Sequence, residues 1–548
     1  MSNEEILAER IDKLTEIGIS LSAEKDLTQL LENILIGAKE LCNADAGTLY
    51  TIHEDENGKR IIKPESLHND TLGIFQGDAR NEKITIPSIP LLNPDGTKNL
   101  ENVVSYSVNC HETVNIENAY NYQGSAFEGM RKIADELGYR SESFLTVPMQ
   151  NHMGDIIGVL QLINAQSDIT GSVISFSKTM QKLVEALASQ AAIALTNQQL
   201  INEQKTLLES IIQLVATAID EKSPYTGDHC RRVPILTMML ADAAHRTSSG
   251  PLKSFEMTSE QRYELEIAAW LHDCGKITTP EYIIDKATKL ETIHDRITDI
   301  STRFEVLKRD NEVAEIKKYI AKKFDDLSEM ELSIQTALDN YNSKADEQLS
   351  FLRKHNTGGE FMAEGDIQEI RNIGKTTWQS ESSCLPLLSD NEIYNLSTRK
   401  GTLTEEEREV INHHIVATIN MLESLPFPKH LSNVPEFAGG HHERMDGKGY
   451  PNGLTREQMS VQARVMGIAD IFEALTARDR PYKKGKTLTE ALRILGFMCE
   501  DNHIDADLFH LFIEQKLYQQ YAENYMDHRQ IDEVDLASIP GYRESLQT

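Results

Sequence analysis

Residues 441–451, HHERMDGKGYP, decide how the C-terminal half of this chain is expected to fold and what it can bind. Two adjacent histidines precede a loop with two closely spaced glycines, which adopt backbone angles that other residues resist, so the loop can curve around a ligand. The loop also carries Arg444, Lys448 and the ring of Tyr450, which suit an anionic substrate with a base to stack on. The histidine pair alone is equally compatible with an ordinary protein surface, so the rest of the chain has to decide.

Histidines and aspartates in other segments extend this into a metal-binding pattern. His272-Asp273 ends the helical segment ELEIAAWLHD, after which Gly275 breaks the helix, and Asp470 lies in the apolar segment VMGIADIFEAL. A carboxylate buried there requires a cation or a metal ion to compensate its desolvation. Imidazoles and carboxylates together suit first-row divalent metals, and one carboxylate can bridge two ions. Six of the 17 histidines belong to the pattern or adjoin it: His229, His272, His413, His414, His441 and His442.

Only one of the adjacent residues His413 and His414 can face a given site, because neighbours on a helix point about 100° apart. The helix face of His414 is apolar. It includes Val410, Ala417 and Met421, whereas the face of His413 includes glutamates. We interpret the apolar face as the inward one, and we expect His414 to be the ligand and His413 to be solvated.

Together the segments LHDCGK, HHERMDGKGYP and IADIFEALTARDRPYK resemble the HD-GYP family of cyclic dinucleotide phosphodiesterases. The resemblance implies an all-α HD-type domain with two divalent metal ions, for which iron or manganese is expected. Some members hold a third ion with a glutamate four residues before the first histidine, but Tyr225 stands there in this chain. By analogy, the first ion is bound by His229, His272, Asp273 and Asp470, and the second by Asp273, His414, His441 and His442.

The resemblance also implies which residues act on the substrate. Asp273 and Lys276 are the catalytic candidates, and Lys276 is placed like the lysine that contacts the phosphate or protonates the leaving oxygen. Tyr450, Arg480 and Lys483 match positions that hold the dinucleotide, since arginine can fork a phosphate or a guanine edge and tyrosine can stack on a base. The chain has one additional residue ahead of RPYK, so the placement of Arg480 and Lys483 is less direct than that of the metal ligands.

The N-terminal part has the pattern of an α+β unit. Residues 5–42 carry one apolar stripe and are expected to be helical, and a further helix is expected at about 126–137. The clearest hairpin joins SFLTVPMQN to DIIGVLQLINA through residues 152–154. Other strand-like stretches lie at 46–53, 60–67 and 105–116.

This order of elements, with the segments VNIENAY, ELGYRSESFLTVPM and GVLQLINA, resembles a GAF domain, which is a sensory module for small molecules. GAF domains that bind cyclic nucleotides carry an Asn-Lys, Phe and Asp-Glu signature. Asn164 and Phe176 are present here, but the lysine and the Asp-Glu pair are not. The ligand of this domain is therefore unknown, and many GAF domains serve only in dimerisation.

Residues 178–222 contain neither glycine nor proline and predict one long helix that ends at Ser223-Pro224. Its apolar residues recur every seven positions, which is typical of a parallel two-stranded coil and hence of a homodimer. The alternative is a helix that packs on its own domain. The seam consists of Ile193, Leu200, Leu207 and Leu214, with Asn197, Gln204, Ile211 and Ala218 at the alternate positions.

The chain is thus expected to be multidomain, with an α+β GAF sensor domain, a long connecting helix and an all-α HD-type domain with an inserted helical hairpin. The hairpin is expected within about residues 291–356, followed by an irregular stretch at 357–400. The expected division is an N-terminal helix at 1–24, a GAF domain at 25–196, a connecting helix at 178–222, an HD-GYP domain at 223–500 with its insertion at about 291–400, and a C-terminal helical extension at 501–548.

Composition limits the partners. The chain has 548 residues and a formal net charge of −31, so its field repels nucleic acid polymers and anionic membranes. No apolar run reaches the roughly 18 residues of a membrane span, and the acidic N-terminus is unlike a signal sequence. The six cysteines have no regular spacing, which favours a reducing cytoplasm over a disulfide framework.

From these features we expect a cytoplasmic phosphodiesterase that hydrolyses cyclic di-GMP to pGpG or GMP under the control of a GAF domain. Two alternatives stay open. One is a receptor that binds the dinucleotide without cleaving it, and the other is a hydrolase for another cyclic dinucleotide such as cyclic GMP-AMP. The complete set of metal ligands argues against the receptor, but the sequence does not distinguish the bases.

Overall fold

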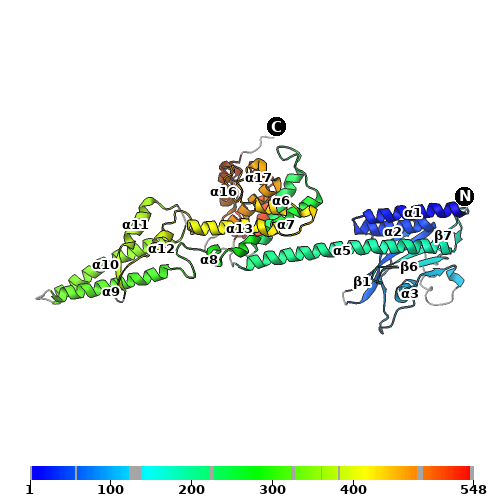
Figure 1. The fold of residues 1–548 in the computed structure, drawn as a ribbon, viewed down its shortest axis with the longest axis horizontal. Coiled ribbons are helices and arrows are strands. Elements are labelled where there is room, and N and C mark those ends of the chain that lie inside the picture. The colour runs from blue at the N-terminus through cyan, green and yellow to red at the C-terminus, as the bar shows by residue number, and fades with distance from the viewer. Residues whose placement is uncertain are drawn as a thin grey trace. The chain divides into compact units, whose positions relative to one another are not determined.

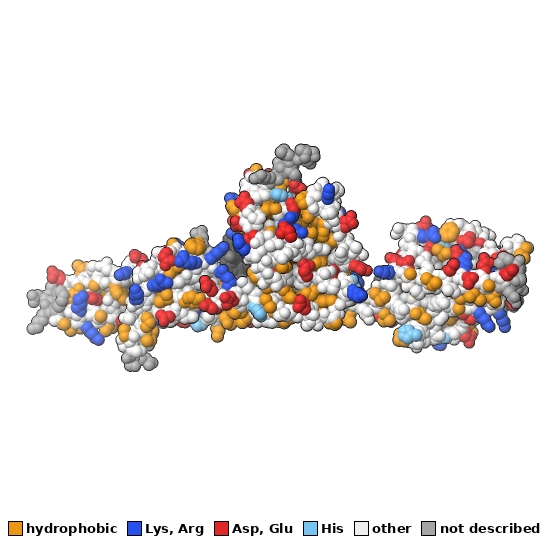
Figure 2. All heavy atoms as spheres, turned by 45° about the horizontal axis from the view of Figure 1, so that its top comes forward, with side chains coloured by type: hydrophobic (Ala, Val, Ile, Leu, Met, Phe, Trp, Pro, Cys, Tyr) orange, Lys and Arg blue, Asp and Glu red, His pale blue; other side chains and the backbone are white. Residues whose placement is uncertain are grey.

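The computed structural model describes residues 3–55, 58–121, 138–222, 228–321, 327–358, 361–380, 383–477 and 485–542 (Figure 1). The chain divides into two compact units, Met1–Leu207 and Leu208–Thr548. Among the described residues, no helix combines the length and the apolar character that crossing a membrane requires. On the face shown in Figure 2, acidic and basic side chains are interspersed over each unit instead of forming one field.

The first unit is built on an antiparallel sheet with the strand order β3-β2-β1-β7-β6-β5, to which β4 and β8 add at β2 and β7. Helices α1 and α2 and the start of α5 bury their apolar residues against this sheet. Helix α3 belongs to a second cluster with residues of β1, β2 and β7. The elements are α1 (Asn3–Ala23), α2 (Leu27–Cys42), β1 (Ala44–Glu54), β2 (Arg60–Asn69), β3 (Ile74–Gly77), β4 (Ile89–Pro90), α3 (Val103–Cys110), β5 (Val114–Ile116), β6 (Phe144–Gln150), β7 (Ile156–Gln166) and β8 (Val173–Ile174).

Two local predictions for this unit are wrong. The single helix expected at 5–42 is two helices, because Asp26 caps a new helix by accepting a hydrogen bond from the backbone N–H of Gln29. The strand expected at 105–116 begins as α3, which Asn102 caps in the same way through Val104 N–H. Valines favoured a strand there, but the cap and the packing of one helix face decide otherwise. The helix expected at 126–137 lies outside the described residues.

Helix α5 (Lys178–Lys222) has 45 residues and contributes to the cores of both units. Its first half buries residues such as Val184 and Leu187 in the first unit, and its last turns bury Ile212, Ala216 and Ile219 in the second. All eight residues of the expected seam at 193–218 are exposed, among them Leu207 and Leu214 at 61% and 69%. The helix therefore buries a different face in its own chain and leaves the seam free.

The second unit has a helical core outside the insertion. It draws on the helices before and after the insertion and also on residues 504–522, which lie in the expected C-terminal extension. The expected order of an α+β unit followed by a helical unit is confirmed. The helices of this core are α6 (His229–Arg246), α7 (Ser259–Leu271), α8 (Glu281–Ile284), α13 (Glu405–Glu423), α14 (Val434–Gly439), α15 (Val461–Thr476), α16 (Leu488–Glu500), α17 (Ala506–Glu514) and α18 (Leu517–Tyr525), and the 3₁₀ turn η4 (Cys274–Thr278) follows α7.

The insertion forms a hydrophobic core of its own. The expected hairpin is present, but the expectation of an irregular stretch at 357–400 is wrong, because two helices and a β-hairpin occupy it. Three isoleucines at 367, 370 and 373 bury one face of the first helix, and Ser389 begins the second with a capping box. The elements are α9 (Ile297–Ala321), α10 (Leu327–Asn356), α11 (Glu364–Gly374), β9 (Thr377–Ser380), β10 (Ser383–Pro386) and α12 (Asp390–Leu396).

Candidate metal centre

Five separate segments of the second unit bring the expected ligands together. His229 is the first residue of α6, and His272-Asp273 joins α7 to η4. His414 lies on α13, the histidine pair at 441–442 follows α14, and Asp470 lies on α15. All are buried except His442 and Asp470, which are half-buried. The expected ligands thus form a single cluster in the core.

Asp273 lies at the middle of this cluster. Its Oδ2 is 3.4 Å from Nε2 of His229 and 3.2 Å from Nε2 of His272. Its other oxygen, Oδ1, is 3.3 Å from Nε2 of His414. Asp470 Oδ1 lies 3.3 Å from His229 Nε2 and 3.8 Å from His272 Nε2. The two oxygens of Asp273 therefore face two different sets of histidines.

The donor atoms fit a divalent metal ion. Buried polar atoms normally have a hydrogen-bond partner, but Asp273 Oδ1 and Nε2 of His272, His414 and His441 have none. A metal ion would satisfy these unpaired atoms, and imidazole and carboxylate are ligands that first-row metals accept. Three groups have ligand atoms within 4.8 Å of one another: His229, His272 and Asp470; His272, Asp273 and His441; and His414, His441 and His442.

The backbone orients three of the imidazole rings. Each ring places its Nδ1 at the carbonyl of the residue three positions earlier, so Nδ1 carries the proton and Nε2 keeps its lone pair for a metal. Burial lowers the pKa of His441 well below its usual value and that of His442 to about 4, so both rings are neutral at neutral pH. The carbonyl partners are Ala269 for His272 at 2.8 Å, Ile411 for His414, and Ala438 for His441 at 2.6 Å.

The fourth ring, His229, is oriented by a residue that the sequence analysis missed. Its Nδ1 contacts the carboxylate of Glu473, which also accepts a 2.6 Å hydrogen bond from Arg232 Nε. Burial opposes ionisation of Glu473, but His229 and Arg232 outweigh it and keep the pKa of the carboxyl below its usual value. Glu473 follows Asp470 by nearly one helical turn in an apolar segment, and a lone glutamate there was the available signal.

We predict that Glu473→Gln weakens binding of the metal ion that His229 is expected to hold by about 10–100-fold. The reason is that the ring loses the carboxylate that orients it and raises its basicity. The measurement is metal content after dialysis against a graded chelator. Glu457→Gln, at an exposed glutamate of the same unit, is the control and should retain metal like the wild type. Equal retention in both variants would contradict a supporting role for Glu473.

Electrostatics keep the two aspartates ionised. Lys276 Nζ is 2.5 Å from Asp273 Oδ2. Burial raises the pKa of Asp273, but Lys276 and His272 outweigh burial and hold it well below the usual range. The pKa of Asp470 is also lowered, because the hydrogen bond to His229 and the charge of that ring outweigh burial. Both carboxylates are therefore anionic at neutral pH, as metal ligands must be.

A close approach between η4 and α13 places Asp273 beside His414. Gly275 N–H donates to Thr418 Oγ1 at 2.9 Å, and a Cβ at Gly275 would lie 2.0 Å from the carbonyl oxygen of His414. Only glycine permits this contact. The close packing of the η4 backbone on α13 therefore brings Asp273 close to His414.

The two adjacent histidines of α13 lie in different environments. His414 is buried and His413 is exposed. The choice of inward face was partly wrong, because Val410 and Met421 are 42% and 37% exposed. Ala417 is buried as expected, and Ile415, Thr418 and Leu422 complete the inward face beside His414.

The loop after the histidine pair is held mainly by its own residues. The ring of Tyr450 stacks on His442 at 4.8 Å with an interplanar angle of 17°. Glu443 accepts hydrogen bonds from the backbone N–H groups of Asn452 and Leu454 at 2.7 and 2.9 Å. The guanidinium of Arg444 is bound to Asp446 and to the carbonyl of Asp501, and its expected role toward an anionic substrate stays a prediction.

Three residues named in the sequence analysis have no described position. Tyr225, Arg480 and Lys483 lie outside the described residues. Their expected roles stay predictions.

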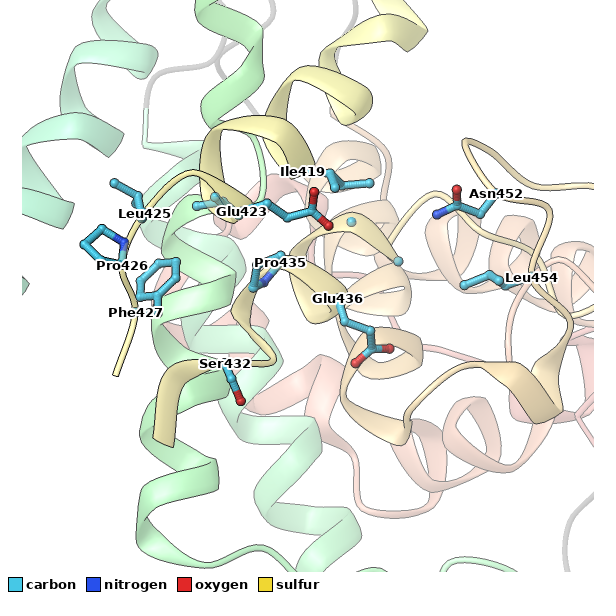
Figure 3. A pocket seen from close by; sticks show the side chains of 13 residues that line it. Ile419, Glu423, Leu425, Pro426, Phe427, Ser432, Pro435, Glu436, Asn452 and Leu454 are labelled. Atoms are coloured by element: carbon cyan, nitrogen blue, oxygen red, sulfur yellow. The ribbon is translucent and has the colours of Figure 1, made fainter. Parts of the chain in front are cut away.

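A groove of about 540 Å³ lies beside the loop, between α13, α14 and the segment that follows Tyr450. Figure 3 shows the side chains that line it. Leu425 and Phe427 lie on one side and Leu454 on the other. Glu423 and Glu436 also line it. No candidate metal ligand is among the described residues that line it. Two carboxylates repel phosphate, so the groove is unsuited to the anionic substrate expected at the metal centre.

Comparisons with known proteins agree with this architecture. Residues 26–195 match the GAF domain, and residues 226–349 and 388–508 match HD domain models. A 3'3'-cGAMP-specific phosphodiesterase of Vibrio cholerae is 35% identical over 125 residues, which are 23% of this chain and 28% of the relative. A cyclic di-GMP phosphodiesterase of Pseudomonas aeruginosa is 38% identical over 117 residues, covering 21% and 27%. One of Thermotoga maritima is 39% identical over 95 residues, covering 17% and 25%. The chain thus spans about a quarter of the length of these relatives.

Proposed function

Because the chain is an HD-domain protein of the HD-GYP type with an N-terminal GAF domain, we propose that it is a metal-dependent phosphodiesterase that hydrolyses cyclic di-GMP to pGpG, GMP or both. The observation that carries the proposal is the cluster around Asp273, whose two oxygens face separate groups of histidines. Relatives that act on cyclic di-GMP support this substrate.

Two divalent ions, iron or manganese, would occupy this cluster. His229, His272 and Asp470 would bind the first, and His414, His441 and His442 the second, with Asp273 shared. When bound, such ions supply a nucleophile at neutral pH and neutralise charge on the phosphate. Asp273 would link the two groups of ligands, since its two oxygens lie near His272 and His414.

The chain's own residues would bind the dinucleotide and donate a proton to its leaving oxygen. Lys276 is the general acid in this proposal, with its Nζ held by Asp273. Burial lowers the pKa of Lys276, but Asp273 and Asp470 outweigh it and keep the amine protonated, so a proton is available for the leaving oxygen. Tyr450, stacked on His442, would present the outer face of its ring to a base, and Arg480 and Lys483 would contact phosphate.

Turnover of a panel of cyclic dinucleotides by metal-loaded protein tests the proposal. Hydrolysis of cyclic di-GMP in preference to cyclic GMP-AMP and to linear dinucleotides is expected. The second candidate substrate is cyclic GMP-AMP, which is favoured by the similarity to a relative specific for 3'3'-cGAMP. A protein that binds a cyclic dinucleotide with both ions present but never cleaves it would instead be a receptor.

We predict that Tyr450→Ala raises KM by about 5–150-fold, because stacking on a base contributes roughly 1–3 kcal/mol. The metal content should stay at the wild-type value, since the ring contacts His442 but supplies no ligand atom. Steady-state kinetics and elemental analysis on the same preparation measure both. Tyr450→Phe is the matched control and should keep KM near wild type, because it retains the ring.

The GAF domain, taken as residues 25–196, would regulate this activity through a ligand whose identity is unknown. Residues 178–222 connect it to the HD-GYP domain at 223–500, and the protein would work in the cytoplasm. The exposed seam of α5 supports a homodimer, since apolar residues at every seventh position are otherwise left in water.

We predict that replacing Leu200 and Leu207 together by glutamate converts the dimer to a monomer, because charges would be buried at two layers of the coil. Light scattering coupled to chromatography gives the mass. Asn202→Glu is the control, since this exposed residue lies on the face of α5 opposite the seam. A monomeric wild type would show that α5 serves only as a spacer.

A further inference from the structure

Lys222, the last residue of α5, binds three backbone carbonyls of the turn that follows Asp273. Its Nζ donates to Lys276 O at 3.1 Å, to Ile277 O at 2.5 Å and to Thr279 O at 2.7 Å. An ammonium group has three N–H donors, so one side chain meets all three acceptors. The end of a helical turn leaves carbonyls that need such donors, and here α5 supplies them from 54–57 positions away.

The turn that Lys222 holds carries the centre of the metal site. Lys276 leaves this turn and contacts Asp273 through its Nζ, while Gly275 N–H fastens the other side of the turn to Thr418 of α13. The backbone between Asp273 and Thr279 is therefore fixed from two sides. If the bonds from α5 were absent, the carbonyls of Lys276, Ile277 and Thr279 would lose the side chain that ties them to α5.

The same end of α5 also contacts the segment that carries His229. Asp220 Oδ1 accepts from Cys230 N–H at 3.4 Å, and Thr217 Oγ1 accepts from Arg231 Nη2 at 3.3 Å. Cys230 and Arg231 directly follow His229 in the first turn of α6. The last turns of α5 are thus bonded to the segment that follows His229 and to the segment that follows Asp273.

We infer that Lys222 is a positioning residue for the hydrolysis proposed above. It acts through the backbone at Lys276 and sets where that ammonium lies relative to Asp273, without touching substrate or metal itself. The inference rests on the proposed function and extends it to a residue outside the ligand set. It also makes the register of this end of α5 part of the geometry of the site.

The first test uses full-length, metal-loaded protein with cyclic di-GMP. Lys222→Met keeps an unbranched stem but removes the terminal ammonium with its donors, and it should lower kcat by about 10–100-fold with metal content and KM near wild type. Lys222→Arg restores charge and donors and should recover most of the rate. Lys253→Met, at an exposed lysine of the same unit, is the control for loss of charge and should leave kcat unchanged.

A double-mutant cycle separates positioning from general destabilisation. If Lys222 acts through Lys276, then Lys222→Met should cost little further rate in a Lys276→Met background. Losses that multiply in the double variant would overturn the inference.

Hydrogen exchange of the segment 274–280 decides the matter independently of turnover. Exchange should be about tenfold faster in Lys222→Met than in wild type and restored in Lys222→Arg, because the bonds that hold the carbonyls of the turn to α5 are lost and the turn opens more often. Unchanged exchange would overturn the inference even if kcat falls. The proposed function and the role of Lys222 can fail separately. If the wild type cleaves no cyclic dinucleotide, the proposed function is overturned. If exchange is nevertheless faster in Lys222→Met than in wild type, the positioning of the turn by Lys222 is supported.

Discussion

Asp273→Ala is expected to reduce hydrolysis on the order of 10⁴-fold and to lower the bound metal from two ions to one or none. The reason is geometric, because Oδ2 lies near His229 and His272 while Oδ1 lies near His414. Without the carboxylate, both groups of ligands lose its negative charge, and the two oxygens of Asp273 no longer connect them. Elemental analysis and turnover on one preparation measure both effects.

His413→Ala is the matched control for this experiment. His413 adjoins a candidate ligand in sequence but is exposed, so metal content and kcat should remain near wild type. His414→Ala, one residue later, should lose metal. An active Asp273→Ala protein that retains two ions would exclude the shared-carboxylate arrangement.

Gly275→Ala is expected to produce the second largest effect, although the change adds a single methyl group. That methyl would lie 2.0 Å from His414 O and 2.6 Å from Thr418 N, and both are backbone atoms that cannot rotate away. Overpacking of this kind costs about 1–3 kcal/mol. The turn must move away from α13 to relieve it, which lengthens the 3.3 Å separation of Asp273 and His414. We expect turnover to fall at least about 10²-fold and the melting temperature to fall with it.

Gly365→Ala is the control for this substitution. Gly365 lies in the first turn of α11, and nothing lies within 4 Å of an added Cβ there. Alanine is favoured over glycine in a helix by about 1 kcal/mol, so this variant should be as stable as wild type or more stable, with unchanged turnover. A Gly275→Ala protein with wild-type stability and turnover would show that the contact between η4 and α13 yields easily.

The candidate metal ligands could be proposed from sequence because ligand chemistry resides in residue type. An aspartate such as Asp470 in an apolar helix, or the pair His441-His442 before a glycine loop, is costly or unusual without a metal. The long α5 could also be predicted, since its period repeats over many turns. Stretches with weak or mixed patterns misled, as α3 and residues 357–400 show, because caps and packing partners outside the segment decided their structure.

The sequence by itself indicated the candidate metal ligands and the segments in which they lie, because residue type and position along the chain are local properties. Only the tertiary structure decided what holds those side chains in place. Glu473 reaches His229 across 244 positions, Thr418 reaches Gly275 across 143, and Lys222 reaches the turn after Asp273 across 54–57. Such contacts depend on how helices pack against one another, and no periodicity or motif along the chain records a distance between residues so far apart.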